Sequence, residues 1–141
     1  MNIPEFSTTE LIEVLPPYQQ ELLKDILMEH TETEAIDLWI KATGPELTTS
    51  FGGTKNIDYL KHFKNEFNKF ILEDESYKSN INELKEHIGI TKYFIVSFLS
   101  SALAEKLGVA AGSIAPLIVL FLGLIGKIGL NAYKAQIKNI D

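Results

Sequence analysis

The stretch Leu107–Gly126, LGVAAGSIAPLIVLFLGLIG, contains no charged side chain in twenty consecutive positions. A helix rises about 1.5 Å per residue, so a helix of this length extends roughly 30 Å, about the thickness of the hydrocarbon core of a bilayer. The rest of the chain is acidic and helix-forming. This contrast indicates a function that depends on contact with lipid or with another protein.

Length and composition are those of a folded protein. The chain has 141 residues, of which 45% are hydrophobic and 23% charged, enough to form one domain with its own core. It has no cysteine, which excludes disulfides and thiolate metal sites. Its polar, acidic start, MNIPEFSTTE, is unlike a signal peptide. We therefore expect a cytoplasmic protein that can associate with a membrane. Its basic residues are all lysine, which is typical of an AT-rich bacterial genome.

The charge is divided unevenly along the chain. Residues 1–90 hold 8 lysines and 17 acidic residues, a net charge of −9, whereas residues 91–141 hold 5 lysines and 2 acidic residues, a net charge of +3. Binding of nucleic acid by counterion release needs clustered basic residues, so the acidic part excludes it. The weakly basic tail fits anionic lipid or the acidic part of the same chain.

Capping patterns divide residues 1–90 into short helices. Ser7 with Glu10, and Thr31 with Glu34, have the spacing of a capping box, and Pro17 suits the first position of a helix. Apolar residues recur at helical spacing after each start. We expect Gly44 and Pro45 to end the third helix, with a loop over 43–56. The expected helices cover about residues 7–15, 17–29, 31–43, 57–72 and 81–88.

The tail predicts a helical hairpin. The first helix covers about residues 91–107 and ends at Gly108, and a tight turn follows. We expect Ser113 to cap the second helix and Pro116 to lie in its first turn, where proline is tolerated. From Ile114 to Ile125 this helix is apolar on every side, and a polar stripe then continues it to the C-terminus (Lys127, Asn131, Lys134 and Lys138).

An all-apolar helix must be surrounded, and two surroundings fit. The first is lipid, because nine of the twelve positions 114–125 are large apolar residues and Lys127 could snorkel from the end of a span. The second is protein, because an apolar segment of this length is as ordinary in a soluble core as in a membrane. In that case Ser97, Ser100, Ser101 and Glu105 would face water. Both hold if a soluble bundle shelters the hairpin and releases it. The candidate contact residues are Ile114, Leu117, Ile118, Leu120, Phe121, Leu124, Ile125 and Lys127.

No pattern predicts a catalytic, metal or cofactor site. Signatures of a nucleophile elbow, a zinc site and a dinucleotide fold are absent from the sequence. The three histidines, at positions 30, 62 and 87, lack the paired spacing of metal ligands and fall on separate predicted helices. Acidic residues at positions 29, 32, 34 and 37 gather where a helix starts, where the helix dipole favours them.

The sequence thus predicts an all-α small helical bundle: an acidic helical head (1–90) and an apolar helical hairpin with a basic end (91–141), packed as one domain. We expect a non-enzymatic bacterial protein without cofactors, which acts through the hairpin on a membrane as an anchor or a disturbing agent. The alternative is a soluble interaction or adaptor subunit whose apolar helix is its own core or docks on a larger protein. Self-association is left open.

Overall fold

The protein was analysed as a computed structural model, which describes residues 3–48 and 55–140, and the side chains of residues 3–41 and 59–138. The described residues form α-helices and one short 3-10 helix, with no strand among them. This confirms the predicted all-α class. The elements are α1 (Thr8–Ile12), α2 (Pro17–Leu27), α3 (Glu32–Thr48), α4 (Lys55–Ile71), η1 (Glu75–Tyr77), α5 (Lys78–Glu86), α6 (Lys92–Leu107), α7 (Ala111–Ile128) and α8 (Leu130–Ile140).

Helix starts follow the capping residues. Ser7 and Glu10 form a complete capping box at α1, and Thr31 and Glu34 exchange the same two hydrogen bonds at α3. Thr91 accepts from the backbone N–H of Phe94 and so caps α6. These local signals were readable from the sequence, and they place the first turns of three helices.

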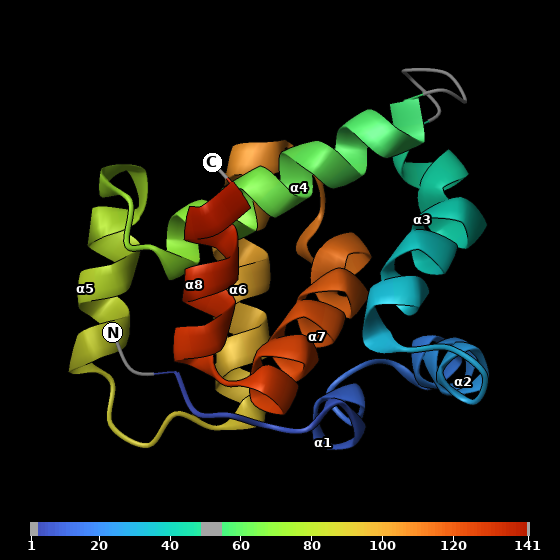
Figure 1. Ribbon diagram of the computed structural model, residues 1–141, viewed down its shortest axis with the longest axis horizontal. Coiled ribbons are helices and arrows are strands. Elements are labelled where there is room, and N and C mark those ends of the chain that lie inside the picture. Colours follow the sequence, from blue (N-terminus) through green and yellow to red (C-terminus); the bar gives the residue numbers. More distant parts are fainter. Residues whose placement is uncertain (1–2, 49–54, 141) are drawn as a thin grey trace.

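The helices surround α7. Figure 1 shows it in the middle of the bundle, and it packs against α6, α1, α3 and α8. The core consists of the apolar faces that meet there, including the rings of Phe63 and Phe67 of α4, whose centroids lie 5.2 and 5.0 Å from that of Phe121. The head and the hairpin therefore share one hydrophobic core.

Two predicted helix ends were wrong. Gly44 and Pro45 do not end the third helix, since α3 continues to Thr48. Proline inside a helix removes one backbone hydrogen bond, and this loss weakens the helix without having to end it. Of the predicted loop, residues 43–48 are helical, and 49–54 lie outside the described residues. At the C-terminus, Gly129 divides the expected continuous helix into α7 and α8, because its φ of +94° lies in the region that favours glycine.

The start of α7 also differs from the prediction. The helix begins at Ala111, and the Ser113 hydroxyl donates to the carbonyl of Ala110 instead of capping. Pro116 therefore lies in the second turn, where it cannot donate to the carbonyl of Gly112. The side-chain amide of Gln19 donates to that carbonyl across 3.4 Å. The side chain of Gln19, a buried residue of α2, thus supplies a donor for the Gly112 carbonyl in place of the N–H that proline lacks.

An N-terminal segment, residues 3–15, lies across α7, and we call it the strap. It contains α1, and Figure 1 shows it running along one end of the bundle. Ile3, Leu11, Ile12 and Leu15 of the strap are all buried in the core. The glycines of α7 allow this approach: a Cβ added at Gly123 would lie 1.9 Å from Oγ1 of Thr8, and one at Gly126 would lie 2.1 Å from the carbonyl oxygen of Phe6.

We predict opposite effects for two glycine-to-alanine substitutions in α7. Gly123→Ala should lower the free energy of unfolding by about 1–3 kcal/mol, because the new methyl group overpacks the contact with Thr8. Gly112→Ala meets no atom within 4 Å and should raise it by roughly 0.5–1 kcal/mol, the usual gain of alanine over glycine in a helix. Urea denaturation followed by circular dichroism measures both. Equal changes in the free energy of unfolding at the two positions would contradict a close contact between Gly123 and Thr8.

Candidate functional site

The candidate contact residues lie on α7, and most of them are in the core. Figure 1 shows this helix enclosed by its neighbours. Leu124 is only partly buried, and Lys127 is exposed at the end of the helix. The other predicted contact residues are all at most 3% exposed: Ile114, Leu117, Ile118, Leu120, Phe121 and Ile125. In this conformation they contact protein, so contact with lipid requires the bundle to open.

Among the described residues, α7 is the one helix long and apolar enough to cross a membrane. Its 18 residues extend roughly 27 Å at about 1.5 Å per residue, and 56% of them are buried. A core helix of a soluble protein has the same length and composition. Three of its partly exposed positions, Ala115, Leu124 and Ile128, are apolar, and Lys127 is the one charged residue of the helix.

Lys127 is held by an acidic residue of α3. Its Nζ lies 3.3 Å from Oε1 of Glu32, and Oε2 of the same carboxylate accepts from the Thr8 hydroxyl at 2.9 Å. Burial alone would raise the pKa of Glu32, but these hydrogen bonds, the one from its backbone and the charge of Lys127 together lower it. Glu32 therefore joins the strap, α3 and the end of α7.

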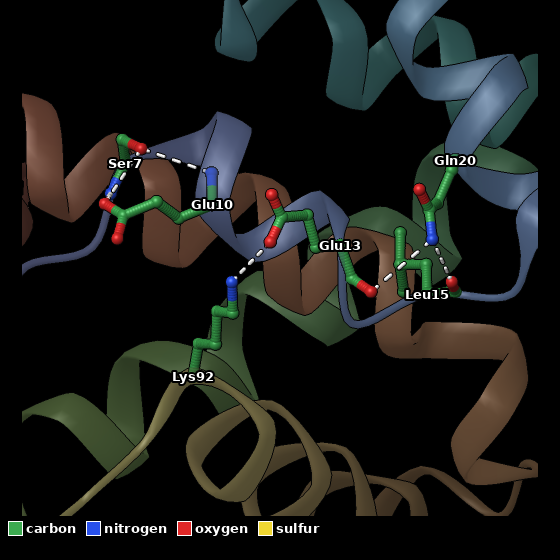
Figure 2. A network of polar contacts seen from close by, with 6 residues as sticks. All are labelled: Ser7, Glu10, Glu13, Leu15, Gln20 and Lys92. Carbon is green, nitrogen blue, oxygen red and sulfur yellow. Dashed lines mark hydrogen bonds and ion pairs between the residues drawn. The ribbon is translucent and has the colours of Figure 1, made fainter.

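Two further carboxylates attach the strap to its neighbours. Glu5 accepts from the backbone N–H of Leu130 at 3.1 Å, at the first position of α8. A carboxylate there satisfies a free helix N–H and is favoured by the helix dipole. Glu13 forms an ion pair with Lys92 of α6, drawn in Figure 2, and the hydrogen bond from Lys92 lowers the pKa of Glu13. The strap is thus tied to α3, α6 and α8.

A pocket of about 290 Å³ lies where the turn between α1 and α2 meets α6 and the start of α7. The hydroxyls of Ser97, Ser100 and Ser101 and the amide of Gln19 line it beside apolar residues. Ser100 is buried, which corrects the expectation that all four polar residues of this face of α6 would meet water; Ser97, Ser101 and Glu105 are exposed. Apart from the phenol of Tyr18 the lining has no titratable side chain, so it offers no general acid or base of ordinary strength.

The histidines lie in three different places, and only His62 is on a helix as predicted, since His30 precedes α3 and His87 follows α5. His30 pairs with Glu34 across 3.5 Å, and the ring of His87 stacks on Phe94 with 3.7 Å between centroids. His62 is exposed on α4. In the part of the chain that the structure describes, no three histidine or acidic side chains come together as metal ligands would.

Comparison with known proteins adds no assignment: no family model matches the chain, and no curated protein or solved structure is significantly similar to it. The sequence predicted residues 7–15 as one more helix of the head, but it did not predict that this segment would lie across α7. One signal is present in the sequence, because Gly123 and Gly126 leave two positions without side chains on an otherwise large and apolar helix. The sequence did not show that their partner would be the N-terminal segment.

The pKa of Glu32 gives a prediction for stability against pH. The unfolded chain takes up the proton near the ordinary value of 4.5, whereas the folded state resists it, so the contribution of Glu32 is present above that pH and is lost as the pH falls through the lower folded value. Wild-type protein should therefore lose stability more steeply below about pH 4.5 than Glu32→Gln. Denaturation at stepwise lower pH measures this. Glu21→Gln, at an exposed position of α2, is the control and should keep the wild-type slope.

Proposed function

We propose that this protein is non-enzymatic and acts on a membrane, and that the folded bundle stores α7 before the helix enters lipid. The observation that carries the proposal is the composition of α7 where the bundle leaves it partly exposed. Ala115, Leu124 and Ile128 are apolar at such positions, although a helix that serves only as a soluble core gains solubility from polar residues there. Lipid is a surrounding that suits every side of this helix.

The charges near α7 support the same proposal. Lys127 lies at its C-terminal end, and Lys134 and Lys138 follow on α8. Lysines beside an apolar span extend to the headgroups, and each contributes about 1 kcal/mol of attraction to an anionic surface. The pairing of Lys127 with Glu32 occupies one of them in the closed bundle. Opening of the bundle would release that lysine for contact with lipid.

A substitution at Leu124 distinguishes the packing of α7 in the folded bundle from its insertion into lipid. In the bundle Leu124 is only partly buried, so a lysine there can extend its ammonium group to water and the fold should be retained. Inside a bilayer the same lysine costs roughly 2.5–3.5 kcal/mol. We therefore expect Leu124→Lys to keep the wild-type circular dichroism spectrum and to lose at least about tenfold in binding to vesicles of phosphatidylcholine and phosphatidylglycerol, since about 1.4 kcal/mol is a factor of ten.

The matched control is Leu124→Met, which keeps the position apolar and should bind vesicles as the wild type does. The vesicle pellet should also resist extraction with alkaline carbonate. The proposal is wrong if wild-type protein remains in the supernatant at every lipid concentration, or if Leu124→Lys binds as well as Leu124→Met.

A second candidate function, a soluble interaction subunit, has its own supporting observation. Tyr18 and Leu22 lie one turn apart on α2 and are 71% and 36% exposed. Large aromatic and aliphatic side chains on one exposed helix face are typical of contact with a protein. If this candidate is correct, Tyr18→Ser combined with Leu22→Ser should abolish a stable complex between the chain and its protein partner without changing the fold of the chain. The wild type should then not bind vesicles.

A further inference from the structure

We infer that the strap is a removable, autoinhibitory cover of α7, whose departure opens the Gly123–Gly126 face of that helix to an anionic lipid surface. The inference rests on the proposed function and adds its regulation. The strap contributes four buried apolar side chains to the core, so the closed bundle is the resting state.

The face of α7 under the strap lacks side chains at two positions. Gly123 and Gly126 lie one turn apart along α7, and the added-Cβ distances of 1.9 and 2.1 Å show that strap atoms occupy the space of the missing side chains. Surfaces built from small residues are also those at which helices approach one another closely inside a membrane. The covered face is therefore smooth, uncharged and suited to a new contact after the strap leaves.

The strap is ordered by its contacts more than by its own helix. α1 has five residues, which is too short for a helix to persist alone in water. Its order depends on the buried side chains and on the polar contacts of Glu5, Thr8 and Glu13 with α8, α3 and α6. Figure 2 shows the capping box of α1 and the Glu13–Lys92 pair at the edge of the bundle. A segment held in this way opens as a local unit.

Departure of the strap also changes the end of α7. Glu5 caps α8 at Leu130, directly after the break at Gly129. Without Glu5 the N–H of Leu130 loses its partner, and a continuous helix across residue 129 would restore one. Continuation from Ala111 to Leu130 would lengthen the apolar segment to about 30 Å, the thickness of a bilayer core. The strap thus holds α7 two residues shorter than the continuous helix would be.

Charge identifies anionic lipid as the partner. Residues 3–15 contain three glutamates and no lysine, and α1 packs on α7 and α6, which belong to the part of the chain with a net positive charge (91–141). An acidic cover repels an anionic surface. Once it leaves, Lys127, Lys134 and Lys138 meet the headgroups without it. The same segment therefore hides the apolar face and opposes the charge of the membrane.

The test compares variants that weaken the strap with variants that weaken the bundle elsewhere. Gly123→Ala pushes Thr8 away from α7, and Gly112→Ala on the same helix meets nothing. Ile81→Ala or Ile81→Val, whichever matches Gly123→Ala in melting temperature, weakens α5, which packs mainly against η1. Full-length proteins are mixed with vesicles of equal parts phosphatidylcholine and phosphatidylglycerol, and the bound fraction is measured by flotation.

We expect Gly123→Ala to bind vesicles roughly tenfold more tightly than wild type, a change that corresponds to about 1.4 kcal/mol in the opening equilibrium. Gly112→Ala and the Ile81 variant should bind as wild type. Equal binding by Gly123→Ala and wild type, or an equal rise for the Ile81 variant, overturns the role of the strap while leaving the proposed function in place. Absence of binding by every variant contradicts the proposed function itself, and the inference with it.

Discussion

The contact between the strap and the bare side of α7 is the constraint on which the rest of the bundle depends. Gly123 and Gly126 remove two side chains from a helix that is otherwise large and apolar, and the N-terminal segment occupies their space. From that position the strap delivers Leu11 and Leu15 to the core and Glu5 to the start of α8. A methyl group at residue 123 would overpack the contact with Thr8. The first residues of the chain thereby complete a core built by its last third.

The same arrangement explains how a chain with so apolar a helix can fold in water. α7 is too apolar to face solvent, and the neighbouring helices contribute buried apolar side chains to enclose it. The aromatic face of α4 illustrates this, with Phe63 and Phe67 against Phe121. The enclosure is complete along the middle of α7 and partial near Leu124 and Ile128. Storage in protein and insertion in lipid then differ by which neighbours surround α7 and by its continuation across Gly129.

Much of this structure could be predicted from the sequence, because it depends on interactions between residues that are close in sequence. Capping boxes at Ser7 and Thr31, the stop at Gly108 and the phenylalanine face of α4 depend on nearby residues, and the helices that they predict are present. The failures involve partners distant in sequence. Pro116 was expected in a first turn, but it lies in the second, where Gln19 donates to the carbonyl it leaves free. The candidate residues were correctly grouped on one helix, whereas their cover depends on contacts across more than a hundred residues.

The most direct test of the central claim is hydrogen exchange, followed by mass spectrometry of peptides, with and without anionic vesicles. In water we expect the backbone amides of both α7 and the strap to exchange slowly, because the strap closes over the helix. With vesicles, amides of residues 3–15 should exchange rapidly while those of α7 stay protected, since its hydrogen bonds persist inside lipid. Retained protection of the strap on vesicles that bind the protein would contradict the account, as would equal loss of protection in α7.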